Sequence, residues 1–251
     1  MGEWSLLTMI GLGSIVNAAT IVVGGCIGLV AGKAINERVR TTLVSGMAVG
    51  TLFIGASSTF SKMLSAGDGG AVECRGALML VMSLAIGAVA GEIVDIDGKL
   101  ERFGVWLRRV SRNENDGSFL NGFVTASLTY CIGAMAILGA LEDGLRGDPS
   151  LLYLKSAMDG IFTIALTASL GKGVIFSAIP ILLYQGGITL AAYPLRQVMT
   201  TEALDAISLT GGVLIFCVGW NILWREKKIR VANLLPSLVV AIVWTLVKGG
   251  L

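Results

Sequence analysis

Eight apolar stretches, each about 20 residues long, constrain this chain more than any other feature of its sequence. A helix of that length crosses the roughly 30 Å of hydrocarbon in a bilayer. The charged residues gather in short segments between these stretches. The sequence therefore predicts one integral membrane domain over 1–251, an all-α polytopic transmembrane helical bundle with spans at 8–32, 42–63, 76–94, 118–140, 151–170, 173–193, 205–224 and 232–249.

The charged fraction and the missing histidines exclude several classes of function. Charged residues make up 14% of the chain, against about a quarter in soluble domains. A net charge of +2 gives no basic field for nucleic acid. Without histidine, Ser–His and Cys–His catalysis and every histidine metal site are absent. We therefore expect no enzyme activity, no cofactor, no metal and no nucleic-acid partner.

The loops between the spans differ in positive charge. Loops 33–41, 95–117, 171–172 and 225–231 hold thirteen of the 19 Lys and Arg residues. Since cytoplasmic loops are enriched in these residues, both termini are predicted to lie outside. Within the longest loop, residues 100–112 contain apolar side chains among basic ones, which predicts an amphipathic helix on the inner leaflet.

The first six spans contain a weak internal similarity. Residues 25–28 (GCIG) in span one align with residues 130–133 (YCIG) in span four, and small-residue runs recur in spans two and five. A duplicated unit of three spans must be inverted, as in many secondary transporters. The alternatives are an inverted repeat of 8–94 and 118–193, followed by two C-terminal spans within 205–249, or chance similarity among helices rich in Gly and Ala.

Four segments carry a resemblance to a known family. They are residues 13–17 (GSIVN), 126–148 (ASLTYCIGAMAILGALEDGLRGD), 219–223 (GWNIL) and 231–236 (VANLLP). In these the chain resembles the YqgA/YdfK-type bacterial inner-membrane proteins, a domain of unknown function, over nearly its whole length. The resemblance implies a multi-pass protein of the bacterial cytoplasmic membrane, sometimes described as a transporter. It supplies no substrate and no site residues.

Asp159 is the strongest site candidate, because an ionisable group at the bilayer centre costs about 2.5–3.5 kcal/mol on insertion scales. It lies near the middle of span five, and Lys155 is placed to pair with it at i, i+4. One interpretation is a cation or proton site that depends on an ionised Asp159. The other is a structural carboxylate that Lys155 or a neighbouring helix satisfies.

Further acidic residues lie near the ends of spans. Glu92 closes span three close to the expected cytoplasmic interface, where solvation is easy, so it is at most a supporting residue. Glu142, Asp143 and Asp148 flank Arg146 at the outer end of span four. They form either a vestibule that attracts cations or a hydrated loop of mutual ion pairs.

Uncharged polar residues inside spans are further candidates for a substrate or ion site. Asn17, Gln185 and Asn221 carry amides that need partners for both oxygen and nitrogen, and they serve either a site or helix packing.

Span four concentrates Ser127, Thr129, Tyr130 and Cys131 just before Gly133. This cluster predicts either a broken helix that offers backbone groups to a solute or a continuous helix whose hydroxyls bond the preceding turn.

Glycines at intervals of four residues mark close helix packing. Gly24, Gly28 and Gly32 form such a series in span one, and it is repeated by Gly46 with Gly50 in span two and by Gly87 with Gly91 in span three. Small residues let membrane helices approach closely. The series is expected to pack spans within one subunit rather than to build a dimer interface.

These features favour a small secondary transporter or ion-coupled permease whose path runs between spans one, four and five. An ion channel would use similar polar residues, and a non-transporting scaffold or regulatory subunit would use Asp159 only for architecture. The expected partners are membrane lipids and a small solute or ion, and the small bundle favours a homo-oligomer.

Overall fold

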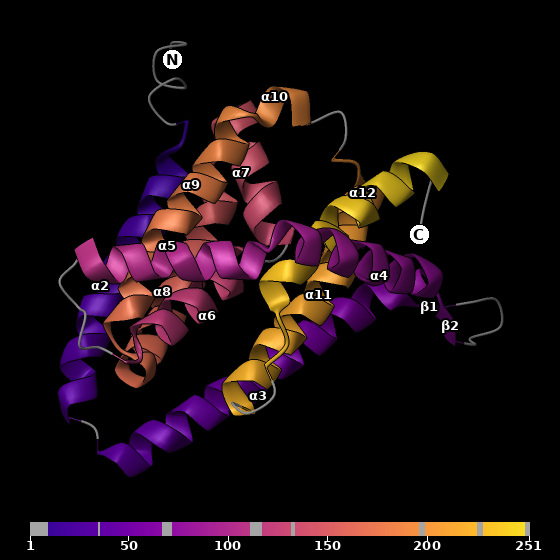
Figure 1. Cartoon of the computed structure of the whole chain (residues 1–251). Coiled ribbons are helices and arrows are strands. Elements are labelled where there is room, and N and C mark those ends of the chain that lie inside the picture. The colour runs from indigo at the N-terminus through magenta and orange to yellow at the C-terminus, as the bar shows by residue number, and fades with distance from the viewer. Residues whose placement is uncertain are drawn as a thin grey trace, which may run out of the picture. The chain divides into compact units, whose positions relative to one another are not determined.

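The computed structural model describes residues 10–34, 36–66, 72–110, 117–131, 134–195, 199–224 and 228–248. Nearly all of them are helical, and the chain divides into two compact units (Figure 1). Unit 1 takes residues 1–47, 100–131 and 135–196, and unit 2 takes residues 48–99, 132–134 and 197–251.

Unit 1 places helices from five elements around one apolar core. Its main elements are α2 (Leu12–Ala34), α6 (Phe119–Cys131), α7 (Ala134–Arg146), α8 (Ser150–Leu170), η2 (Lys172–Ser177), α9 (Ala178–Leu190) and α10 (Ala192–Leu195). Most of α5 (Ile96–Val110) and the first part of α3 (Glu37–Met63) also belong to it. The core gathers Ile21, Tyr130, Leu166, Val174 and Ile181 from α2, α6, α8, η2 and α9.

Glycines bring α2 and α8 into close contact along their length. A Cβ built at Gly24 would lie 2.8 Å from the carbonyl oxygen of Gly160, and one at Gly32 would lie 3.0 Å from Ala168. At the other end, Gly13 lies against Leu152. Residue numbers therefore rise together, so the two helices are parallel (Figure 1). The expected packing within one subunit is confirmed for these glycines of α2, whereas no described atom lies within 4 Å of a Cβ at Gly46 or Gly50.

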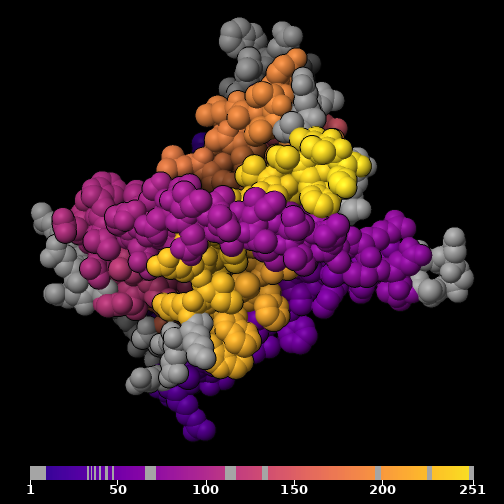
Figure 2. All heavy atoms as spheres, turned by 45° about the vertical axis from the view of Figure 1, so that its right-hand side comes forward, coloured from indigo at the N-terminus to yellow at the C-terminus, as the bar shows by residue number. Residues whose placement is uncertain are grey.

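Unit 2 also packs helices closely at glycines, around a smaller core. It contains the end of α3, β1 (Leu64–Ala66), β2 (Val72–Cys74), α4 (Ala77–Val94), α11 (Thr201–Leu223), η3 (Val231–Leu234) and α12 (Pro236–Lys248). Gly87 and Gly91 of α4 lie against Ser237 and Asn233. Figure 2 shows the purple atoms of α4 packed on the yellow atoms of α12.

The predicted all-α polytopic bundle is confirmed, and its span count is approximate. Among the described residues, six helices are long and apolar enough to cross a membrane, or seven spans if α6 and α7 count as one broken span. The 27-residue helix α3 covers predicted span two but is not among the six. The inverted repeat, the single membrane domain, the outward termini and the homo-oligomer stay predictions.

Local structure adds two details to the sequence analysis. The predicted amphipathic segment is helical, as α5, with Trp106 about half exposed beside Phe103. The loop after span two contains an antiparallel hairpin that the sequence analysis did not predict. In it β1 pairs with β2 in the register Leu64↔Cys74 and Ala66↔Val72.

Candidate functional site

One face of α8 carries the two charged residues of that helix. Lys155, Asp159 and Thr163 follow one another at intervals of four residues, which places them on successive turns of the same face. Lys155 Nζ donates to Asp159 Oδ2 at 2.5 Å. The exposed fractions of the two residues are only 7% and 8%. The predicted ion pair therefore exists, and it lies inside an apolar span.

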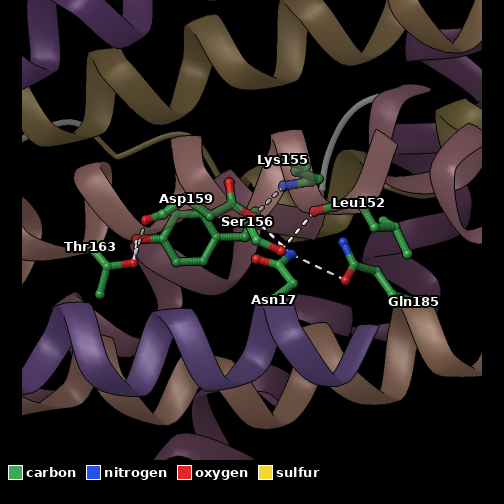
Figure 3. Close-up of polar contacts among 8 residues, drawn as sticks. Asn17, Leu152, Lys155, Ser156, Asp159, Thr163 and Gln185 are labelled. Atoms are coloured by element: carbon green, nitrogen blue, oxygen red, sulfur yellow. Dashed lines mark hydrogen bonds and ion pairs between the residues drawn. The ribbon is translucent and has the colours of Figure 1, made fainter. Parts of the chain in front are cut away.

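Two amides from other helices complete this cluster (Figure 3). Asn17 of α2 points between Asp159 and Gln185 of α9. Its Nδ2 donates to Asp159 Oδ2 at 3.0 Å and to Gln185 Oε1 at 3.1 Å. A carboxylate only accepts hydrogen bonds, so the NH2 group of Asn17 must face Asp159. Both of its protons are then used, one for each partner.

The same geometry leaves one acceptor and one donor without partners. Asn17 Oδ1 and Gln185 Nε2 are buried and have no hydrogen-bond partner among the described residues. An unsatisfied buried polar group costs about 1–3 kcal/mol. The cluster therefore has one free acceptor and one free donor for a ligand, next to the Asp159 carboxylate, which is paired with the ammonium group of Lys155.

Tyr130 and Thr163 form a second layer beside the ion pair. Thr163 Oγ1 donates to the Asp159 carbonyl oxygen at 2.6 Å, and the Tyr130 hydroxyl lies 2.7 Å from Thr163 Oγ1. Because the single threonine proton is already used, Tyr130 is the donor of this second bond. Lys155 Nζ also lies 6.0 Å from the Tyr130 ring centroid, within the range of a cation–π contact.

The remaining candidates of span four make no described hydrogen bond to Asp159 or Lys155. Ser127 Oγ is buried and has no partner among the described residues. Thr129 Oγ1 bonds the Thr125 carbonyl of its own helix at 2.7 Å. Cys131 packs on the apolar core, and Gly133 lies outside the described residues.

The segment predicted as span four contains two helices, α6 and α7, near this cluster. Helix α6 ends at Cys131, α7 begins at Ala134, and the two axes differ by 61°. The Thr129 hydroxyl bonds the preceding turn of α6, but α6 and α7 do not form one straight helix, and the pair is either a broken span or a re-entrant segment.

Asn221 and Glu92 belong to unit 2, and their described contacts lie within that unit. Asn221 Nδ2 donates to the Ile229 carbonyl at 2.7 Å, and its Oδ1 accepts from the Ile229 amide at 2.8 Å. Glu92 forms an exposed ion pair with Arg230 at 2.9 Å. Both therefore support the turn that leads into η3, and their proposed part in a site of spans one, four and five has no support in their contacts.

Sequence analysis missed Thr163 and expected Asp143 in a vestibule or a hydrated loop. Thr163 follows Asp159 by four residues, a spacing that could have identified it. Asp143 is buried, which excludes the hydrated loop for this residue, and its Oδ2 accepts the Gly11 amide at 3.1 Å. It therefore caps the start of α2.

The contacts of Asn221 predict a structural role that can be measured. Asn221→Ala removes two hydrogen bonds to Ile229, and since the turn is exposed, water replaces part of them. We expect the free energy of unfolding to fall by about 1 kcal/mol, with no change in any ligand response. Chemical unfolding in detergent measures the first, and a ligand-induced thermal shift measures the second. A lost ligand response in a folded variant would contradict this assignment.

The apolar spans and the buried polar cluster define a polytopic α-helical membrane protein. The chain belongs to the family described as "Protein of unknown function (DUF554)", which it matches over residues 12–246. This confirms the resemblance found in the sequence.

Two relatives cover almost the whole chain. The Bacillus subtilis (strain 168) "Uncharacterized membrane protein YdfK" is 29% identical over 91% of this chain and 93% of its own. The Escherichia coli (strain K12) "Uncharacterized protein YqgA" is 26% identical over 92% of this chain and 94% of its own length. No solved structure matches the chain.

Proposed function

We propose that this protein is a small secondary transporter of the bacterial cytoplasmic membrane that carries a cation past Asp159. The observation that carries this proposal is the buried Lys155–Asp159 pair with the unsatisfied amide groups of Asn17 and Gln185 beside it. Ionisable groups inside a membrane usually mark an ion or substrate path. We propose no enzymatic reaction for this site.

Lys155 would act as an internal cation that competes with the transported one. Its ammonium group holds the carboxylate of Asp159, and the ring of Tyr130 offers it a second position 6.0 Å away. A cation that binds Asp159 can also use Asn17 Oδ1 as an oxygen ligand, since this atom has no partner among the described residues. Binding of Lys155 to Asp159 would then alternate with binding of the cation to the same carboxylate.

Flux measurements in liposomes test the proposal. Purified protein is reconstituted, and uptake of Na⁺ and K⁺ and internal pH are followed under an imposed pH or cation gradient. We expect uptake by the wild type and a loss to the level of empty vesicles for Asp159→Asn. Asn221→Ala is the matched control, because it changes an amide outside the cluster.

Each other outcome removes the proposal. Single-channel conductance in a planar bilayer would identify a channel. No uptake of either cation and no pH change by a folded wild type would favour a scaffold, with Asp159 as a structural carboxylate. Equal uptake by Asp159→Asn and the wild type would show that this cluster is not the site.

A further inference from the structure

Five buried polar atoms at one end of unit 1 have no hydrogen-bond partner among the described residues. They are Ser14 Oγ, Asn17 Oδ1, Asp143 Oδ1, Gln185 Nε2 and Thr189 Oγ1. Folded proteins leave only a few such groups unsatisfied per hundred residues. Five of them gather on three elements of one unit, and each such group calls for an explanation, such as a bound water or ion.

The residues that carry these five atoms extend from Asp159 toward the start of α2. Asn17 of α2 bonds Gln185 of α9, and Gly25 lies against Ile175 of the preceding η2, so α9 runs antiparallel to α2. Ser14 lies one turn before Asn17, and Thr189 lies one turn after Gln185. Both steps lead away from Asp159 toward the start of α2.

Asp143 lies at the start of α2, close to the end of α9 that carries Thr189. Its Oδ2 accepts the amide of Gly11, at the start of α2, at 3.1 Å. The next residue, Gly144, lies against the Thr189 carbonyl oxygen. The free Oδ1 of Asp143 therefore belongs to the same end of unit 1 as Ser14 and Thr189, which the loop charges predict to face outward.

We propose that these five groups line a hydrated access path through which a small cation reaches Asp159 from the end of α2 that carries Gly11. Water makes about three hydrogen bonds in buried sites, so a short file of waters satisfies a series of hydroxyl, amide and carboxylate groups. The proposed path has a carboxylate at each end, Asp143 and Asp159, and only Asp159 is paired with an ammonium group, that of Lys155, so the path favours cations over anions. The nature of the transported solute rests on the proposed function, whereas the hydration of the path does not.

Cysteine labelling tests the path without measuring transport. The four native cysteines are first replaced by Ala, and then Ser14→Cys and Thr189→Cys are each introduced. Ile21→Cys and Ile181→Cys are the matched controls, because these fully buried residues lie on the same two helices but within the apolar core. Each variant is first shown to be folded by its thermal transition.

A charged methanethiosulfonate reagent reacts only with a thiol that water reaches. We expect labelling of Ser14→Cys and Thr189→Cys but not of the two isoleucine controls. A cationic reagent should react several-fold faster than an anionic one, and Asp143→Asn should reduce this preference. Because Asp143 also caps α2, Asp143→Glu serves as a second variant that keeps the charge and should keep the preference.

The outcomes separate the path from the transporter. Equal, slow labelling of the polar positions and the controls shows that the region is dry and overturns the path. A faster reaction with the anionic reagent overturns its selectivity for cations. Labelling as expected in a protein that moves no cation leaves the path in place and removes the proposed function instead.

Discussion

Asp159→Asn alone should destabilise the protein far more than the double variant Lys155→Met/Asp159→Asn. The single change leaves the Lys155 ammonium buried without its anion. Removal of one partner from a buried ion pair costs about 3–5 kcal/mol, whereas replacement of the whole pair by uncharged groups is often nearly neutral. Urea or guanidinium unfolding in detergent, followed by circular dichroism, measures both free energies.

A second ion pair of the same chain is the matched control. Lys62 and Asp205 lie 2.6 Å apart in unit 2, and their side chains are about one-third exposed. Exposed pairs couple by about 0–1 kcal/mol. The cycle of Lys62→Met and Asp205→Asn should therefore show little coupling. If the Lys155–Asp159 cycle gives an equally small value, the pair is solvated and the buried charged site is wrong.

Flux measurements on the double variant Lys155→Met/Asp159→Asn separate the effect on transport from the effect on stability. The double variant should recover stability but not flux, because the carboxylate is still missing. A purely structural pair would give the opposite pattern, with function restored together with stability. The stabilised double variant therefore distinguishes a transport residue from an architectural one, which a poorly folded single variant does not.

Sequence reasoning predicted the parts of the site that depend on local geometry. The pairing of Lys155 with Asp159 follows from their spacing on one helix. The membrane spans follow from their length and apolar composition. Asn17 and Gln185 were recognised as polar residues inside spans, but their contact joins positions 168 residues apart. No period or spacing in the sequence encodes such a contact, because it depends on how α2, α8 and α9 pack.

The hairpin and the role of Asn221 show the same limit. Strands β1 and β2 have three residues each, too few to display the alternation of a longer strand. Asn221 met the same criterion as Asn17, a polar amide within an apolar span. Its partner Ile229 lies only eight residues further on, beyond the end of α11. Composition alone therefore does not separate an amide of the site from one that supports a turn.

Replacement of glycine by alanine should have opposite effects on stability at Gly28 of α2 and Gly187 of α9. A Cβ at Gly28 would overlap the backbone carbonyl oxygen of Ile164 and lie 2.9 Å from Thr167 Cβ. No atom lies within 4 Å of a Cβ at Gly187 of α9. Gly28→Ala should lower the free energy of unfolding by about 1–3 kcal/mol through overpacking. Gly187→Ala should raise it by up to about 1 kcal/mol, because alanine loses less backbone entropy in a helix.

Gly28→Ala should also reduce ligand response, although Gly28 lies far from the charged cluster. It is eleven residues from Asn17, about 16 Å along the helix, so it touches none of the site residues directly. Because α2 and α8 are held together along this seam, separating them also moves Asn17 away from Asp159. Unfolding and thermal-shift measurements on both variants check this. Equal stability of Gly28→Ala and Gly187→Ala would show that α2 and α8 do not pack this closely, and the Asn17–Asp159 contact would then have no support from its own scaffold.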